Sequence, residues 1–324
     1  MTSPAITIDS FFHANQAAAL KPTTVVDYEI QIRHFRRYWH QHLASLGEVP
    51  TEPTLGDLSI AHIYGAMNAQ LTAGCSKGTA DKIRRAMSSM WYHAADLGLV
   101  DQPKGRIKRM RGHLHEPDAW STAEFGAILD ASKQLQGKVG DMQLADWFPA
   151  ILLLVYNSGL RISSAMAAEW DWIDTGGLRI QVPPKFQKDD EGKIITLLPE
   201  AAEAIDRLRG SHKSQVFGAW KFDRYQGSSW RALTLRLKRC IVAAGLAENL
   251  DAVSKRSLWH KVRRTFATLA YAASNDIEHV RDMLGHSCIS VTYRYIDRTR
   301  LGRRTQADLI PAPSMLPRRN KKAG

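Results

Sequence analysis

Five residues in three short motifs have types and spacings that suit chemistry on a phosphate group. A Gly-Leu-Arg-Ile-Ser turn carries Arg161, and a His-x-x-Arg pair places His260 three residues before Arg263. A Leu-Gly-His turn ends in His286, and Tyr295 follows nine residues later. Arginines can bind phosphate oxygens, histidines can move a proton, and a tyrosine can act as a nucleophile. The set predicts a site that binds a phosphodiester and offers it a tyrosine hydroxyl.

The arginines, histidines and tyrosine of such a site depend on one another. A guanidinium stays charged and donates paired hydrogen bonds, so Arg161 and Arg263 are suited to grip two non-bridging phosphate oxygens. His260 and Arg263, at i and i+3 on a helix, would share one face and could reach the same phosphate. A free tyrosine has a pKa near 10, and forming its phenolate at pH 7 costs about 4 kcal/mol. Nearby arginines lower that cost, and a histidine can take the proton as attack begins.

In this order and at these spacings, the motifs make the chain resemble the tyrosine recombinase (phage integrase) family over about residues 20–300. The resemblance implies that Tyr295 attacks a scissile phosphate of DNA, leaving a 3′-phosphotyrosyl link and a free 5′-hydroxyl. It assigns the other catalytic roles to Arg161, His260, Arg263 and His286. The bond energy is kept in the phosphotyrosyl link, so the resemblance implies no cofactor, neither ATP nor a metal ion.

The departing 5′-oxygen needs a general acid, and the resemblance implies a lysine on a β-hairpin beside the scissile phosphate. The predicted hairpin offers Lys185, Lys188 and Lys193. We select Lys188 because it ends the first strand just before the turn. Lys185 remains the alternative, since the loop that follows Lys188 is longer than in typical members.

Two positions depart from the pattern of many members. Ser164 stands where an acidic residue often follows the arginine turn, and Arg264 stands where a second histidine often follows the His-x-x-Arg arginine. Neither position is a catalytic group. We therefore expect the departures to change local hydrogen bonds and not the reaction.

Two further tyrosines are rival nucleophiles. Tyr293 lies two residues from Tyr295, on a different side of a helix, and Tyr271 lies on the helix of His260. Only Tyr295 has the nine-residue spacing from His286, so we interpret the other two as packing residues. Each motif residue taken singly has an ordinary structural explanation, and it is their ordered coincidence that predicts a site.

The elements that would position these residues are mostly helical. A Ser-Thr-Ala-Glu capping box at Ser121 opens the second half of the chain, Gly285 should end one helix, and Ser287 should cap the next. Two segments rich in β-branched residues predict a two-stranded hairpin. The predicted strands are 178–182 and 193–198, and the predicted helices are 121–136, about 145–157, 200–209, 230–244, 260–273, 276–284 and 289–296.

Residues 21–112 predict a smaller helical domain. A capping box at Thr24–Asp27 opens a first helix, in which apolar residues recur every three or four positions. A second helix is predicted over about 59–74, and a third, capped by Thr79, ends near residue 98.

The expected fold is mainly α with a small β-sheet, of the tyrosine recombinase type. An N-terminal helical core-binding domain and a mixed α/β catalytic domain would form a C-shaped clamp on duplex DNA. The expected boundaries are 1–112, with a basic linker at 103–112, then 113–300, and a C-terminal tail at 301–324. The resemblance implies that such a tail is exchanged between protomers.

The charge of the chain favours a polyanionic partner. Lys and Arg outnumber Asp and Glu by 44 to 32, for a net charge of +12, which predicts attraction to nucleic acid. Two basic clusters are candidates for DNA backbone contacts, although a solvated helix face or linker would have the same composition. The candidates are Lys77, Lys82, Arg84, Arg85, Lys104, Arg106, Lys108, Arg109 and Arg111.

Several other classes of protein are disfavoured. The three cysteines lie far apart without CxxC spacing, which argues against a disulfide framework and a zinc ribbon. No apolar run approaches the roughly 20 residues that a bilayer requires. We expect a cytoplasmic, nucleoid-associated protein. By the resemblance, its partners are double-stranded DNA recombination sites, and it assembles as a homotetramer on paired sites. A monomeric relaxing topoisomerase and a non-enzymatic DNA-binding protein remain the alternatives.

Overall fold

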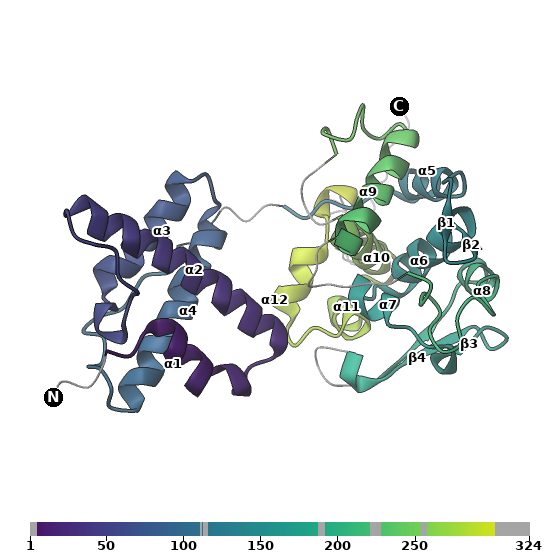
Figure 1. The fold of residues 1–324 in the computed structure, drawn as a ribbon. Coiled ribbons are helices and arrows are strands. Elements are labelled where there is room, and N and C mark those ends of the chain that lie inside the picture. The colour runs from purple at the N-terminus through teal and green to yellow at the C-terminus, as the bar shows by residue number, and fades with distance from the viewer. Residues whose placement is uncertain are drawn as a thin grey trace, which may run out of the picture. The chain divides into compact units, whose positions relative to one another are not determined.

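The computed structural model describes residues 5–110, 112, 116–186, 192–220, 228–253 and 258–301. The chain divides into two compact units, residues 1–115 and 116–324, each with its own hydrophobic core (Figure 1). The division lies close to the expected boundary at residues 112 and 113. The two are called unit 1 and unit 2 below.

Unit 1 is a bundle of helices in its described residues. Its elements are α1 (Ile8–Asn15), η1 (Ala17–Ala19), α2 (Pro22–Ser45), η2 (Leu55–Asp57), α3 (Ile60–Thr72) and α4 (Lys77–Asp96). The predicted helices correspond to α2, α3 and α4. The first helix, α1, was not predicted, and it buries Phe11 and Phe12 in the core of the unit.

The helices of unit 1 begin at different residues from those that the capping patterns suggested. Lys21 is the N-cap of α2, because Pro22 at the first helical position already has a helical φ and lacks an N–H that would need a partner. At the start of α4 the side chain of Ser76 accepts a hydrogen bond from the backbone N–H of Thr79. The capping roles expected of Thr24 and Thr79 are therefore wrong. The apolar stripe of α2 is nevertheless buried as predicted.

The basic stretch that was expected to be a linker packs against unit 1, at least as far as Met110. Ile107 is buried in the core of the unit. The backbone N–H of Lys108 donates to the Tyr64 hydroxyl at 2.7 Å, and that of Met110 donates to the Asp81 carboxylate at 3.0 Å. One apolar side chain thus anchors the stretch, while the basic side chains on either side of it stay exposed.

Unit 2 combines helices with short strands. Its elements are α5 (Thr122–Ser132), β1 (Lys138–Val139), β2 (Met142–Gln143), α6 (Leu144–Ser158), α7 (Ile162–Met166), η3 (Trp170–Trp172), β3 (Ile173–Asp174), β4 (Arg179–Val182), η4 (Pro184–Phe186), β5 (Lys193–Thr196), α8 (Pro199–Asp206), α9 (Ser228–Ala243), α10 (Leu258–Ser274), α11 (Ile277–Leu284), α12 (Ile289–Thr292), η5 (Tyr293–Tyr295) and η6 (Arg298–Arg300). The capping box predicted at Ser121 is present at the start of α5.

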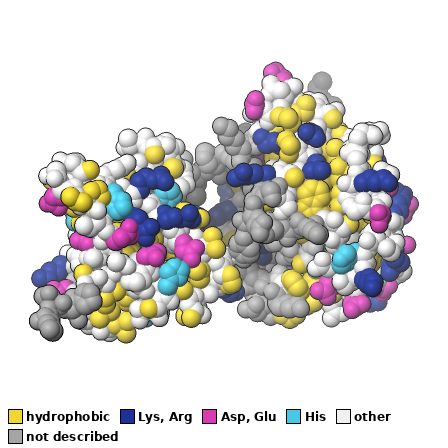
Figure 2. Space-filling model, viewed as in Figure 1, with side chains coloured by type: hydrophobic (Ala, Val, Ile, Leu, Met, Phe, Trp, Pro, Cys, Tyr) yellow, Lys and Arg dark blue, Asp and Glu magenta, His cyan; other side chains and the backbone are white. Residues whose placement is uncertain are grey.

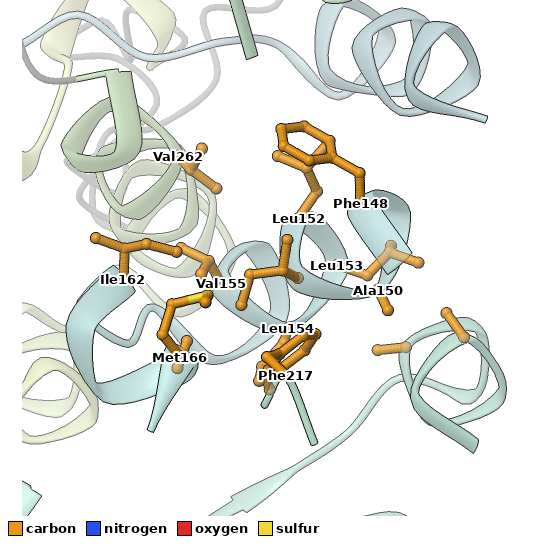
Figure 3. Packing of buried hydrophobic residues seen from close by; sticks show 14 of the residues in the cluster. Phe148, Ala150, Leu152, Leu153, Leu154, Val155, Ile162, Met166, Phe217 and Val262 are labelled. Carbon is orange, nitrogen blue, oxygen red and sulfur yellow. The ribbon is translucent and has the colours of Figure 1, made fainter. Parts of the chain in front are cut away.

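Helix α6 lies at the centre of the core of unit 2. Every side chain from Trp147 to Val155 is buried, and Figure 3 shows Leu152, Leu154 and Val155 in this packing. Phe217 and Val262, from other parts of the unit, belong to the same cluster. A helix that is apolar all round must be covered all round, so α6 organises the elements that surround it. No helix in the described parts of the chain is long and apolar enough to cross a membrane.

The predicted hairpin is present and gains a third strand. β4 and β5 pair antiparallel, with Ile180 opposite Ile195. β3 pairs antiparallel with the other edge of β4, which gives the order β3-β4-β5. β3 has two residues, too few for the alternating pattern from which strands are predicted. The two-stranded prediction was therefore incomplete.

The end of α6 requires a glycine. Gly159 is the C-cap residue, with φ +62 and ψ +12 in the left-handed region. A Cβ at this position would lie 2.4 Å from Cδ1 of Phe266 and 3.0 Å from Cδ2 of Leu284. Both the backbone conformation and the packing against α10 and α11 thus exclude a side chain here.

We expect Gly159→Ala to lower the free energy of unfolding by about 2–5 kcal/mol, from backbone strain and overpacking together. Gly245→Ala is the matched control, because Gly245 has φ +71 and a Cβ added there would meet nothing within 4 Å. It should show the backbone cost alone, about 1–2 kcal/mol. Urea unfolding of both variants measures the difference, and equal losses would contradict the packing constraint.

Candidate active site

The buried guanidinium of Arg263 joins the three sequence motifs. Arg263 lies on α10 and is 2% exposed. Its Nη1 donates to the backbone carbonyl of Gly159, and its Nη2 donates to that of Leu284, each at 2.6 Å. Nη2 also lies 3.1 Å from Nε2 of His286. One side chain therefore holds the end of α6, the end of α11 and the histidine that follows α11.

His286 lies in the turn that Gly285 makes at the end of α11, as the sequence predicted. Gly285 is the C-cap residue, with φ +64, and His286 is 8% exposed. The other ring nitrogen of His286, Nδ1, lies 3.0 Å from Oγ1 of Thr292. Cys288, not Ser287, is the N-cap residue of α12, so the capping role expected of Ser287 is wrong.

Tyr295 lies beside both histidines and Arg263. The centroid of its ring is 4.9 Å from that of His286 and 6.3 Å from that of His260. Cζ of Arg263 lies 5.6 Å from the same ring centroid. The structure thus brings four of the predicted residues together, although Tyr295 ends the 3-10 helix η5 and does not lie on the α-helix predicted over 289–296.

Arg161 is placed at the same helix end but differs from Arg263 in its partners. It is the N-cap residue of α7, two residues after Gly159, and it is partly exposed. Within the described parts of the chain, its guanidinium forms no hydrogen bond or ion pair. Arg263 is thus held by the protein, whereas Arg161 has donors to offer a ligand.

The three hairpin lysines differ in their place in the structure. Lys188 lies outside the described residues, and Lys185 lies in η4. Lys193 begins β5, and its Nζ donates to the backbone carbonyl of Asp282 on α11 at 2.7 Å. The choice of Lys188 over Lys185 stays a prediction.

The two departures from the family pattern both make structural hydrogen bonds. Ser164 on α7 donates to the carbonyl of Phe186 at 2.8 Å, which ties the arginine turn to η4. Arg264 donates to the Asp118 carboxylate at 2.6 Å, and Lys261 forms an ion pair with the same group at 3.0 Å. Burial raises the pKa of Asp118, but the hydrogen bond from Lys261 and the charge of Arg264 outweigh it and hold that pKa below its usual value.

Asp297 is a site neighbour that the sequence analysis missed. It is 4% exposed, and its carboxylate accepts hydrogen bonds from the backbone N–H of Ala119 at 2.8 Å and from the hydroxyl of Thr299 at 2.6 Å. Its own N–H donates to Oγ1 of Thr268 at 3.0 Å. The chain entering unit 2 is therefore hydrogen-bonded to the segment that follows Tyr295. A lone aspartate two residues after the tyrosine carries no spacing signal that could have indicated this.

The rival tyrosines have other surroundings. Tyr293 is 41% exposed, and Cζ of Arg298 lies 5.3 Å from its ring centroid. Tyr271 is partly buried against the small apolar cluster that includes Val280 and Leu284. The placement of Tyr271 fits its interpretation as a packing residue, whereas the exposed ring of Tyr293 does not.

The basic candidates in unit 1 fall into two groups. Lys82 is paired with Asp27 at 2.7 Å, and Arg84 makes two hydrogen bonds to Asp81, at 2.7 and 3.1 Å. Such cations are partly neutralised, and Figure 2 shows Lys and Arg lying among Asp and Glu on the visible face of this unit. Arg111 lies outside the described residues. The exposed candidates are Lys77, Arg85, Lys104, Arg106, Lys108 and Arg109.

No group of three or more His, Cys, Asp or Glu residues within the described parts of the chain could hold a metal ion. Cys75, Cys240 and Cys288 are free thiols. Burial raises the pKa of Cys240 to about 12, which makes it unreactive.

Residues 123–300, more than half of the chain, match the model of the phage integrase family. Among curated proteins the chain is 25% identical to tyrosine recombinase XerC of Brucella melitensis, over 87% of each chain. It is 26% identical to tyrosine recombinase XerC of Halalkalibacterium halodurans, over 86% of this chain and 89% of the relative.

Solved structures show the same fold at low sequence identity. A lambda integrase dimer bound to a COC′ core site has a TM-score of 0.65 at 16% identity, covering 93% of this chain and 100% of that one. The Tn1549 transposon integrase in complex with a circular intermediate DNA also has a TM-score of 0.65, at 15% identity, covering 90% and 95%. With the family match over 123–300 and the motifs gathered around Arg263, the chain belongs to the phage integrase family.

Proposed function

We propose that the protein is a site-specific DNA recombinase that cleaves and rejoins DNA through a 3′-phosphotyrosyl intermediate. The observation that carries the proposal is that His260, Arg263 and His286, from two separate segments, lie together around the ring of Tyr295. The relatives named tyrosine recombinase XerC and the fold shared with DNA-bound integrases support it. The protein would act in the cytoplasm, on duplex DNA.

Binding of the scissile phosphate falls to the two arginines. Arg161 offers donors that no described residue occupies, and it is positioned by the turn at Gly159. Arg263 is fixed by the carbonyls that accept from it, so its charge would act on the phosphate without a loss of side-chain freedom on binding. The two charges would stabilise the negative charge that develops on the non-bridging oxygens.

Strand cleavage exchanges one phosphate ester bond, to the 5′-oxygen, for another, to Tyr295. The hydroxyl oxygen of Tyr295 forms a bond to phosphorus while a histidine takes its proton, with His260 and His286 both beside the ring. The bond from phosphorus to the 5′-oxygen breaks, and Lys188 gives a proton to the leaving oxygen. In the reverse step the 5′-hydroxyl of a second strand attacks the phosphotyrosine. No bond energy is lost, so neither ATP nor a metal ion is needed.

The proposed partners are double-stranded DNA recombination sites and further copies of the chain. A lambda integrase tetramer bound to a Holliday junction has a TM-score of 0.64 with this chain, at 17% identity and covering 94% of it. By this analogy we propose a homotetramer on paired sites, whose protomers exchange the tail of residues 301–324. An open, mainly apolar pocket of about 710 Å³ lies beside β5, α10 and α11 and could bind such a segment.

The exposed cations of unit 1 are proposed to contact the DNA backbone. Arg85, Lys104, Arg106, Lys108 and Arg109 are exposed, as is Lys77. The charges of Lys82 and Arg84 are partly offset by Asp27 and Asp81, and Arg109 also pairs with Asp81 at 3.9 Å, so these three would contribute less. Contacts of this kind give affinity and orientation but little sequence selectivity.

We expect Tyr295→Phe to abolish covalent capture of DNA and to leave DNA binding nearly unchanged, because the hydroxyl takes part only in the chemistry. The substrate is a nicked duplex made from the DNA that flanks the gene, so that the cleaved strand diffuses away and the adduct accumulates. Denaturing gels measure the adduct and gel shifts measure binding. Tyr293→Phe is the matched control and should form the adduct. An adduct in Tyr295→Phe, or its loss in Tyr293→Phe alone, would refute the assignment.

Cleavage should continue in excess EDTA, because arginine charges and not a divalent ion would stabilise the transition state. The assay is covalent capture on the same substrate, before and after chelation. Loss of the adduct with EDTA and its return with magnesium would contradict the proposed mechanism.

If Lys188 is the general acid, Lys188→Ala should slow cleavage by about 10²–10⁴-fold with little change in binding. A substrate whose bridging 5′-oxygen is replaced by sulfur has a leaving group that needs little protonation, so it should restore most of the rate. The same substrate should not rescue Arg161→Ala, whose lost charge acts on the non-bridging oxygens. Lys185→Ala is tested in parallel. Rescue of Lys185→Ala, with Lys188→Ala cleaving at the parent rate, would transfer the role to Lys185.

A further inference from the structure

Thr292 makes a buried contact to the site that the proposed mechanism does not use. Its side chain is fully buried at the end of α12, three residues before Tyr295. Its Oγ1 lies 3.0 Å from Nδ1 of His286. On the opposite edge of that ring, Nε2 lies 3.1 Å from Nη2 of Arg263. His286 is therefore held between a hydroxyl and a guanidinium.

The arginine determines which nitrogen of His286 carries the proton. A guanidinium only donates hydrogen bonds, so Nη2 of Arg263 is the donor and Nε2 of His286 must be the acceptor. A neutral imidazole with a bare Nε2 carries its proton on Nδ1. Nδ1 therefore donates to the oxygen of Thr292, since a hydroxyl oxygen can accept.

We propose that Thr292 is a positioning residue that, together with Arg263, holds His286 as the Nδ1–H tautomer, in which Nε2 accepts from the guanidinium. The proposal rests on the recombinase function proposed above and deepens it. In this tautomer Nε2 accepts a hydrogen bond from Arg263 and cannot donate one. The ring of His286 is thereby fixed in its orientation beside Tyr295, whose ring centroid lies 4.9 Å away.

The position of Thr292 in the chain links the tautomer of His286 to the placement of Tyr295. Thr292 ends α12 and Tyr295 ends the 3-10 helix that follows directly, so one turn of chain sets both groups. Without the hydroxyl, the N–H at Nδ1 of His286 would be a buried donor lacking its partner, at a cost of about 1–3 kcal/mol. The ring could avoid that cost by rotating or by moving its proton to Nε2, and either change breaks the hydrogen bond that Nε2 accepts from Arg263, so the ring loses its fixed orientation beside Tyr295.

Two substitutions separate the effect of the Thr292 hydroxyl from the effect of the side-chain shape. Thr292→Val keeps the branched side chain and removes the hydroxyl, whereas Thr292→Ser keeps the hydroxyl and removes a methyl group. We expect Thr292→Val to slow covalent capture on the nicked duplex by about 10- to 100-fold, the rate equivalent of the lost hydrogen bond. Thr292→Ser should recover most of that loss, and DNA binding should be equal in all three proteins.

A spectroscopic measurement tests the tautomer directly, on the full chain without DNA. Long-range proton–nitrogen correlation spectra of protein labelled with ¹⁵N-histidine distinguish a protonated ring nitrogen from a bare one. For His286 of the parent protein and of Thr292→Ser we expect a protonated Nδ1 and a bare Nε2, and for Thr292→Val a changed pattern. Thr265→Val is the matched control, because Thr265 is a fully buried threonine on α10 whose hydroxyl binds Lys261 and Trp120. It should leave the His286 signals unchanged.

The outcomes are distinguishable. A protonated Nε2 in the parent protein would overturn the proposal, and that measurement needs no variant to fold. An unchanged tautomer in Thr292→Val, or capture by that variant at the parent rate, would also overturn it. A parent protein that forms no adduct would refute the proposed function, while the spectra would still decide whether Thr292 sets the tautomer.

Discussion

The burial of the Arg263 guanidinium is the interaction on which the site depends. A buried cation is stable only where acceptors surround it, and two of its acceptors are the carbonyls of Gly159 and Leu284. Both lie at the carboxyl ends of helices, where carbonyls lack partners within the helix and the helix dipole is negative. Arg263 can therefore be buried only when α6 and α11 both end beside it.

The same constraint explains why glycine occurs in two of the motifs. Gly159 and Gly285 have φ values of +62 and +64, and each reverses the chain so that a helix can end with its carbonyls accessible. Arg161 follows the first turn and His286 follows the second. The motifs around Arg161 and His286 thus describe helix ends as much as reacting groups, and their order along the chain reflects how those ends meet on α10.

Local signals in the sequence predicted much of the molecule, and long-range contacts account for the rest. The stripe of α2, the capping box at Ser121 and the glycine turns could be predicted because each depends on residues within a few positions. The docking of Ile107, the strand β3 and the partner of Thr292 could not, because each depends on a neighbour that no fixed spacing identifies. The 3-10 geometry at Tyr295 has the same origin, since the chain after it is held by Thr268 on α10.

The carboxylate of Asp297 has a mechanical consequence. It is hydrogen-bonded to the amide of Ala119, a residue 178 positions earlier, just where the chain enters unit 2. A displacement of the chain at that entrance can therefore reach the residues after Tyr295 through this hydrogen bond, without passing through the core around α6.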